Sequence, residues 1–268
     1  MKKWVSAPYL VWMVVFIVVP LVMVAYFAFT NEAGEFTLEY IRQVRAYSNI
    51  FARSIGLAAI ATVICLIISY PVALILSKME ARTQSTMLMI VMLPMWMNFL
   101  LRTYAWQTIL GNNGILNELL GFIGLGPYKM LNTQGAVVLG MVYNYIPYMI
   151  LPLYSVMVKI DKSVIEAAAD LGCDGFKTLR KVIIPLSMPG IISGITMVFV
   201  PAISTFIISR MLGGGGTMLI GDLIEMQFLG TSYNPNLGAG ISLVLMVIVF
   251  IIMAVMNKFG DSDDPVLM

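Results

Sequence analysis

The sequence predicts an all-α integral membrane protein with six transmembrane helices and one long loop between the fourth and the fifth. Hydrophobic residues make up 60% of the 268 residues and charged residues only 11%, whereas a soluble domain of this length needs far more charge to cover its surface. The mean hydropathy is +0.91. Six separate stretches are each long enough to cross the bilayer, which takes about 20 mostly apolar residues in a helix.

Segments with glycine, proline, asparagine and most of the charge separate the six stretches. We expect spans at Tyr9–Thr30, Ser54–Ser77, Met87–Leu110, Gly135–Val158, Met188–Ser209 and Gly238–Asn257. The first is too long for the apolar core of a secretory signal, which has about 7–15 residues, so we interpret it as an uncleaved span. Since the sequence contains neither an internal repeat nor a low-complexity segment, we expect residues 1–268 to form a single transmembrane domain.

Lysine and arginine are distributed unequally between the two sides of the predicted membrane. An even number of spans places both termini on one side, and that side has ten of the 16 basic residues against five on the other. The ten are Lys2, Lys3, Lys78, Arg82, Lys159, Lys162, Lys177, Arg180, Lys181 and Lys258. The positive-inside rule therefore predicts that both termini and the long loop, residues 159–187, are cytoplasmic.

The composition excludes several kinds of site. Histidine is absent, which removes the commonest general base and the commonest metal ligand. Cys65 lies in a span and Cys173 in the long loop, so we expect neither a disulfide nor a metal pair. The net charge of +2, without a clustered basic face, argues against nucleic-acid binding.

Motifs for nucleotide binding are also missing. The P-loop pattern Gly-x4-Gly-Lys-Ser/Thr does not occur, and the run Gly213–Gly216 lacks the lysine and lies in an outer loop. We therefore expect no catalytic residue, no metal site and no cofactor in this chain. If ATP drives transport, it must bind another subunit.

The first half of the long loop predicts a short helix. Ser163 to Glu166 fits a capping box, and Asp161 is an alternative N-cap two residues earlier. Three consecutive alanines, residues 167–169, are strong helix formers. Gly172 can adopt the left-handed conformation that ends such a helix.

The second half of the loop predicts another helix. Asp174 can cap it, and Phe176, Leu179 and Ile183 share one face with basic residues around the rest. We expect Pro185 to block its continuation, because proline lacks the backbone N–H that a helix interior requires.

The spacing within this loop resembles a known family. Glu166-Ala167-Ala168, three residues, Gly172, nine residues and Val182-x-Ile184-Pro185 are similar to the EAA loop of ABC-importer permeases, Glu-Ala-Ala-x3-Gly-x9-Ile-x-Leu-Pro. The resemblance implies a type I, MetI-like permease fold in which this loop is a coupling helix seated in a groove of an ATPase subunit. It implies that six residues couple the chain to the ATPase: Glu166, Ala167, Ala168, Gly172, Asp174 and Pro185. An ordinary interfacial helical hairpin is the alternative.

Further segments are similar to the spermidine/putrescine permeases, over nearly the full chain. They are Leu93–Tyr104, Met211–Gly214, Leu219–Gly221 and Gln227–Leu229. This resemblance implies a bacterial cytoplasmic-membrane system with a second permease subunit, two ATPase subunits that bind ATP and Mg²⁺, and an extracytoplasmic polyamine-binding protein.

The spans themselves neither require nor exclude a polycation. They contain no Asp or Glu, and Arg102, the ionised residue well inside a span, has the wrong sign for a cation site. Arg102 is expected to snorkel to the outer headgroups or to contact the other permease, and a role in gating is the alternative. We select Trp96, Asn98, Tyr104, Tyr143, Asp222 and Glu225 as candidates for a weak cation path, with Tyr145 and Asn144 beside them. The competing interpretation is that the aromatic residues pack or anchor at the interface and the two acids are solvated.

Other functions are less consistent with the sequence. The same machine could carry an anion or a metal chelate, which Arg102 and the absence of acids in the spans would favour. An ion-driven carrier would place an ion site at mid-membrane, and none is seen. An intramembrane enzyme would lack the usual histidine and aspartate chemistry.

Overall fold

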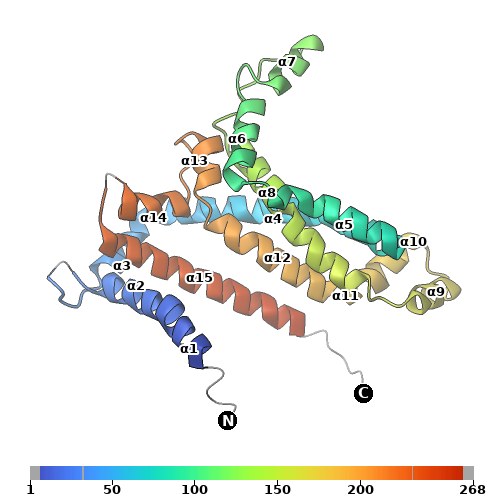
Figure 1. Ribbon diagram of the computed structural model, residues 1–268, viewed down its shortest axis with the longest axis horizontal. Helices are drawn as coiled ribbons and strands as arrows, with labels where there is room; N and C mark the ends of the chain where they lie inside the picture. The colour runs from blue at the N-terminus through green and yellow to red at the C-terminus, as the bar shows by residue number, and fades with distance from the viewer. Residues whose placement is uncertain (1–6, 32, 231, 262–268) are drawn as a thin grey trace.

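The computed structural model describes residues 7–261 except 32 and 231. Within these residues the chain is helical, apart from loops and one isolated β-bridge between Thr30 and Phe36. The predicted all-α fold class is therefore confirmed. Figure 1 shows the long helices lying side by side, with the α9–α10 segment beyond one end of the bundle and the α3 and α14 segments at the other.

Four helical segments are each long and apolar enough to cross a membrane: Pro8–Phe29, Glu39–Ser77, Gln134–Met157 and Pro235–Lys258. The first consists of α1 (Ala7–Met13), the π-helical turn η1 (Val14–Val18) and α2 (Val19–Phe29). The second consists of α3 (Glu39–Gln43), the 3-10 turn η2 (Val44–Tyr47) and α4 (Ser48–Ser77). The other two are α8 (Gln134–Met157) and α15 (Pro235–Asp261). Two bent helix pairs bring the number of crossings to six when each pair counts as one span.

The third predicted span consists of two helices that meet at a sharp bend. α5 (Ala81–Trp96) and α6 (Phe99–Ile109) meet at 86°. The side chain of Asn98 accepts hydrogen bonds from the backbone N–H groups of Leu100 (2.8 Å) and Leu101 (3.4 Å). Asparagine in this position caps a new helix, and it therefore turns the chain where hydropathy alone shows one continuous apolar stretch. α6 leads into the short α7 (Ile115–Phe122).

The fifth predicted span ends earlier than expected. α12 (Met188–Ile203) stops six residues before Ser209, and a separate helix, α13 (Ile207–Gly213), follows. The hydroxyl of Ser204 donates to the carbonyl oxygen of Val200 at 3.1 Å, which occupies one of the last acceptors of α12. α14 (Ile220–Leu229) then leads to α15.

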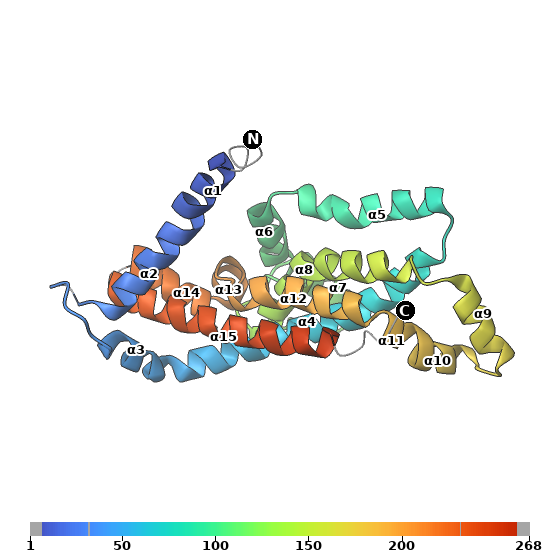
Figure 2. The same ribbon diagram turned by 90° about the horizontal axis from the view of Figure 1, so that it is seen from below.

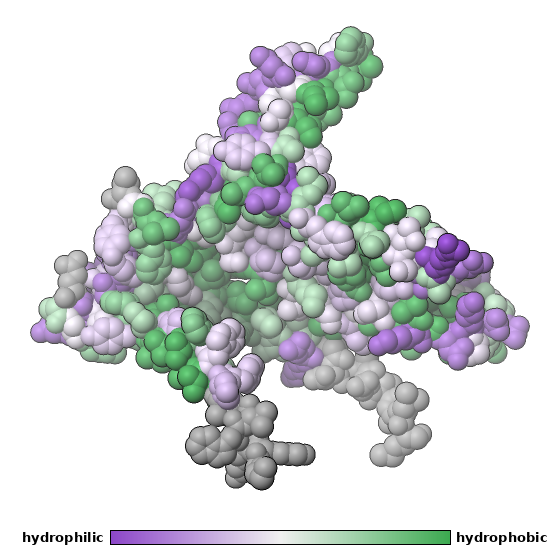
Figure 3. Space-filling view, in the orientation of Figure 1, coloured by the Kyte–Doolittle hydropathy of each residue, from purple (hydrophilic) through white to green (hydrophobic). Residues whose placement is uncertain are grey.

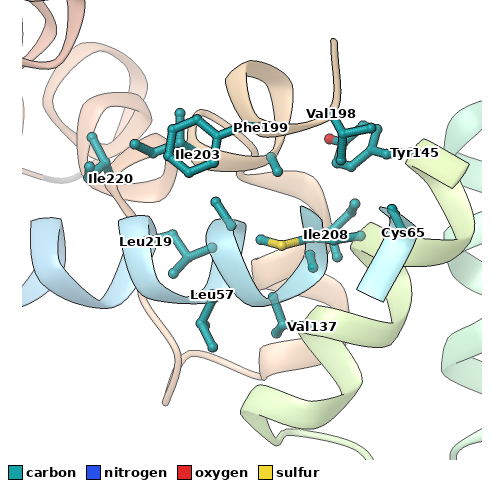
Figure 4. Close-up of a cluster of buried hydrophobic side chains, with 14 of the residues drawn as sticks. Leu57, Cys65, Val137, Tyr145, Val198, Phe199, Ile203, Ile208, Leu219 and Ile220 are labelled. Atoms are coloured by element: carbon teal, nitrogen blue, oxygen red, sulfur yellow. The ribbon is translucent and has the colours of Figure 1, made fainter. Parts of the chain in front are cut away.

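The core lies between α4, α8, α12, α13 and α15. Figure 4 shows side chains from several of these elements meeting in it, including Leu57, Val137, Val198 and Ile208. Glycines bring α12 and α8 together: a Cβ on Gly190 would lie 2.9 Å from the carbonyl oxygen of Pro152. This close approach agrees with the packing that small residues allow between membrane helices.

The first span is set apart from this core. The apolar window of Pro8–Phe29 is not buried by the rest of the chain. Figure 2 shows α1 diverging from the bundle, while α2 approaches α15 near its other end. Its exposed apolar surface is free to contact lipid or another subunit.

Candidate functional site

The long loop forms the predicted helical hairpin. Its first helix, α9, covers Lys162–Asp170. Asp161 is the N-cap, and its carboxylate accepts a hydrogen bond from the backbone N–H of Ser163 at 2.9 Å. This bond lowers the pKa of Asp161. Of the two caps that the sequence allowed, the structure therefore uses Asp161 and not Ser163.

A glycine turn joins the two helices of the hairpin. Gly172 has a φ of +77°, a left-handed conformation that other residues adopt at a cost. The N–H of Cys173 donates to Ala168 O (3.0 Å) and the N–H of Gly172 to Ala169 O (2.9 Å). These two bonds form a Schellman motif, which ends α9 and reverses the chain.

The second helix begins as predicted but does not end as predicted. The carboxylate of Asp174 accepts from the backbone N–H of Lys177 at 2.7 Å and caps α10 (Gly175–Thr178). The chain continues through the π-helical turn η3 (Leu179–Ile183) into α11 (Ile184–Leu186). Pro185 lies inside this run. Because it stands in the first turn of α11, where the helix needs no backbone N–H donor, it does not block the helix.

The chain bends at Ser187 instead. The helical run Gly175–Leu186 meets Met188–Ile203 at 68°. Ser187 is fully buried and shares a 2.9 Å hydrogen bond with the hydroxyl of Tyr70 in α4, and its Oγ donates to the carbonyl of Ile184 at 3.0 Å. The bend is thus fastened to a membrane-spanning helix, which lets a force on the hairpin reach the bundle.

The hairpin presents apolar side chains at its outer tip. Leu171 is 86% exposed and Phe176 is 72% exposed, although both are large and apolar. Glu166 and Ala167 are exposed beside them, whereas Ala168 is buried against the hairpin itself. We call Glu166, Leu171 and Phe176 the hairpin tip. Clustered exposed apolar groups on a polar segment mark a protein contact.

The predicted path residues of α5 and α6 lie at the corner between these helices. Trp96 is 71% exposed and Tyr104 is 59% exposed. Asn98 is exposed, but its side-chain oxygen caps α6. The two rings are therefore available to a ligand or a neighbouring subunit, whereas the side chain of Asn98 is used as a helix cap.

The predicted path residues of α8 point in different directions. Tyr143 packs edge-on against Trp106 of α6, with ring centroids 5.3 Å apart. Tyr145 is buried, and its hydroxyl donates to the carbonyl oxygen of Pro201 at 3.3 Å. Asn144 is buried and donates to the carbonyl oxygen of Gly140 at 2.8 Å. The structure therefore does not bring these side chains together with Trp96 at one surface.

The two acids on α14 have separate environments. Asp222 is buried, and its carboxylate accepts a hydrogen bond from the N–H of Leu219 at 2.8 Å. Burial raises its pKa, while hydrogen bonds from Ser209 and Leu219 and the charge of Arg210 oppose the rise. Glu225 forms a two-point ion pair with Arg210. A cavity of about 110 Å³ beside them is lined by Arg210 and Asp222 among others.

Two polar residues in this region were not anticipated. Arg210 neutralises Glu225 across 15 residues of sequence, and Ser54 of α4 accepts a hydrogen bond from the N–H of Ile220 at 2.9 Å. Together with Asp222, Ser54 satisfies the first N–H groups of α14. Both contacts join residues that are far apart in the sequence, and no local sequence pattern indicates them.

Arg102 is buried within this chain. It is 8% exposed, and its Nε and Nη1 atoms are buried without a hydrogen-bond partner among the residues that the structure describes. Its guanidinium carbon lies 5.9 Å from the centroid of the Phe99 ring. The expectation that Arg102 snorkels outwards is therefore wrong, because its side chain is covered by its own fold.

The buried carboxylate of Asp222 predicts a pH-dependent stability. Because its pKa is raised on folding, the folded state holds the proton more tightly, and stability falls as the pH rises from about 4 towards the raised pKa. Asp222→Asn keeps an oxygen that can accept from the N–H of Leu219. Its stability should fall less with rising pH than that of the wild type, and its melting temperature at neutral pH should be higher. Thermal unfolding in detergent across this pH range measures both. Glu225→Gln is the control, with a change below about 1 kcal/mol. An Asp222→Asn profile parallel to wild type would contradict the assignment.

A family model decides the relationship of the chain to known proteins. Residues 1–259 match the family described as the binding-protein-dependent transport system inner membrane component. The chain belongs to this family. It is a multi-pass inner-membrane component of a transport system, in agreement with its apolar helices.

Relatives in two bacteria are similar over most of their length. The chain is 37% identical to the spermidine/putrescine transport system permease protein PotB of Haemophilus influenzae, over 91% of the chain and 88% of that protein. It is 36% identical to PotB of Escherichia coli K12, over 91% of the chain and 92% of that protein.

Solved structures share the fold. A bacterial ABC transporter that imports the acidic polysaccharide alginate has a chain that superposes with a TM-score of 0.82 at 13% identity, covering 98% of this chain and 97% of that one. The inward-facing MetNI methionine ABC transporter gives a TM-score of 0.61 at 15% identity, covering 84% and 99%. The predicted ABC-importer permease fold is confirmed.

Proposed function

We propose that this chain is one of two permease subunits of an ATP-driven importer of polyamines, with ATP and Mg²⁺ bound by separate ATPase subunits. The hairpin tip carries the proposal: Leu171 and Phe176 are exposed apolar groups on a capped hairpin that is hydrogen-bonded to the bundle at Ser187. Such a surface needs a partner. The residue pattern Glu166–Pro185 supports an ATPase as that partner.

The coupling residues have distinct tasks in this proposal. Asp174 and Gly172 hold the hairpin shape, since the first caps α10 and the second makes the left-handed turn. Glu166 and Ala167 face outwards and are available to the ATPase. Ala168 packs inside the hairpin, and Pro185 stiffens the run that leads to the bend. When the ATPases close, the hairpin moves and the spans tilt as rigid bodies.

A second permease subunit completes the proposed pathway. The apolar window of the first span is not buried by the described residues, and Trp96 and Tyr104 are exposed on α5 and α6. These surfaces support a heterodimer in which each chain supplies half of the path. An extracytoplasmic binding protein would deliver the cargo to the end that carries α14, and the basic residues near both termini support a cytoplasmic position for the hairpin end.

The PotB relatives support polyamines as the cargo. The exposed rings of Trp96 and Tyr104 offer weak cation–π contacts. Glu225 is neutralised by Arg210, and Asp222 is buried, so neither is a free carboxylate for a polycation. A path with weak sites fits transport, because the cargo has to leave, and it assigns tight recognition to the binding protein.

An anion or a metal chelate is the second candidate cargo. The specific observation in its favour is the buried guanidinium of Arg102, whose Nε and Nη1 have no partner within the described part of the chain. This charge could be neutralised by an anionic cargo or, equally well, by a carboxylate of the second permease subunit.

Competition between unlabelled solutes and labelled spermidine separates the two cargo classes. In vesicles that contain the complete complex, including the binding protein, we expect putrescine and spermidine to reduce ATP-dependent uptake of labelled spermidine, and sulfate-like anions to leave it unchanged. Arg102→Gln should retain polyamine selectivity, because an unpaired positive charge does not attract a cation. ATP-dependent uptake of an anion, without uptake of spermidine, would favour the second candidate.

A further inference from the structure

The helices α6 and α7 form an arm that leaves the bundle sideways. α5 lies along α4 and α8, and α6 turns away from it by 86°. Figure 1 shows α6 and α7 extending sideways out of the bundle. If the bundle crosses the membrane along its long axis, the arm runs parallel to the membrane plane.

The depth of the arm follows from the length of α5. Its 16 residues rise about 24 Å in a helix, which is close to the hydrocarbon thickness of about 30 Å. α5 begins beside the hairpin end of the bundle, where Gln84 bonds to Ser77 and Met79 at the end of α4. Its other end therefore lies close to the opposite membrane surface, within the outer leaflet, and the arm starts there.

The arm ends in a fixed turn. Asn117 of α7 is buried and makes three hydrogen bonds: its amide donates to the carbonyl oxygens of Gly111 and Tyr128, each at 3.0 Å, and its oxygen accepts from the N–H of Tyr128 at 2.9 Å. α7 is thus pinned to the chain before and after it. Its orientation is a feature of the fold and does not depend on a partner.

One face of α7 is apolar and uncovered. Ile115, Leu119, Phe122 and Ile123 are 58%, 56%, 88% and 68% exposed, and their spacing places them together on a helix. Glu118 lies at the flank of this face. Figure 3 shows hydrophobic side chains along the right-hand side of the arm, towards the hairpin end, and hydrophilic ones along its left-hand side.

We propose that the apolar face of α7 lies in the outer leaflet of the bilayer, so that the arm is an interfacial amphipathic helix. The apolar side of the arm is turned towards the membrane interior, and the polar side towards water. Helices with one apolar and one polar face bind membranes in this way. The direction of the face distinguishes lipid from a binding protein, which would approach from the water side.

The segment that follows α7 continues this arrangement. After α7, Tyr128 is 53% exposed and Lys129 is also exposed. Tyrosine favours the headgroup level, and lysine attracts the headgroup phosphates.

Lipid quenching at single labelled positions tests this proposal. The fluorophore NBD is attached to Phe122→Cys in a Cys173→Ser background, because Cys65 is buried and Cys173 is partly exposed. The complete complex is placed in nanodiscs with lipids that carry a nitroxide near the headgroup. Gly121→Cys is the matched control, because helical spacing places it on the side of α7 opposite the apolar face and, apart from its own helix backbone and chain neighbours, a Cβ at this position meets no atom of the described residues within 4 Å. Ile115→Cys replaces Phe122→Cys if that variant does not fold.

We expect blue-shifted emission at position 122 and quenching by nitroxide lipid at least about twofold stronger than at position 121. Equal quenching at the two positions would overturn the proposal. Blue-shifted emission at position 122 without lipid quenching would also overturn it, because the second permease subunit would then cover the face. This experiment does not depend on the cargo.

Discussion

Replacing Gly172 by valine is expected to reduce transport about tenfold. The left-handed conformation at this position, with φ of +77°, costs a residue with a side chain about 1–2 kcal/mol, and a β-branched one more. A loss of about 1.4 kcal/mol is tenfold in an equilibrium. Apart from its two chain neighbours, no atom of the described residues lies within 4 Å of a Cβ built on Gly172, so the effect comes from the backbone conformation and not from a clash.

Gly172→Asn is the matched control for this variant. Asparagine enters the left-handed region more readily than other residues with a side chain, and the open space around Gly172 accepts it. ATP-dependent uptake and ATP hydrolysis by the reconstituted complex should be close to wild type with asparagine and low with valine. Equal activity of the two variants would show that the hairpin turn does not transmit the motion.

Replacing Phe176 by alanine is expected to weaken ATPase binding by about 2 kcal/mol, which is about thirtyfold in affinity. Large aromatic anchors that become buried at an interface contribute most of its binding energy. The ring is 72% exposed in this chain, so the change removes few contacts within the fold. Titration of the purified ATPase against the permease dimer in nanodiscs measures the affinity.

Phe122 offers a control of the same residue type on the arm, away from the hairpin. It is 88% exposed, and Phe122→Ala should leave ATPase affinity unchanged, because α7 extends sideways from the bundle and is well separated from α9 and α10 (Figure 1). An affinity loss that is equal in both variants would point to a general destabilisation. No loss in Phe176→Ala would remove the hairpin tip from the interface.

Local signals in the sequence predicted much of the fold. Apolar stretches located the membrane helices, and the end of the second span at Ser77 was predicted correctly because charge follows at once. Asp174 and Gly172 act in the structure as the cap and turn that their residue types indicate. These features depend on a few neighbouring residues, so a single sequence contains the information.

Other features depend on chemistry that hydropathy does not measure. A single side chain, Asn98, turns the third span, although the flanking residues are apolar. Pro185 was expected to end a helix but lies in the first turn of a new one, because the preceding turn is π-helical. Arg210 and Glu225 meet only because α13 and α14 fold back on each other.

The hairpin has a direct physical connection to the spans. Ser187 bonds to Tyr70 of α4 at the bend before α12, and the hydroxyl of Tyr154 at the end of α8 donates to Gln84 of α5 at 3.0 Å. α4 is thus hydrogen-bonded to the base of the hairpin, and α5 is hydrogen-bonded to the end of α8, which leads into the hairpin. This arrangement supports rigid-body coupling, since packed helices move as units.

Site-specific cross-linking between the hairpin and the ATPase tests the central claim most directly. Cysteine at the exposed Ala167, in a Cys173→Ser background, is treated with a short cross-linker in membranes that contain the complete complex, and Glu118→Cys on α7 is the control. The account predicts an adduct of this chain with the ATPase subunit from position 167 and none from position 118. An ATPase that is present and active but forms no adduct from position 167 would contradict it.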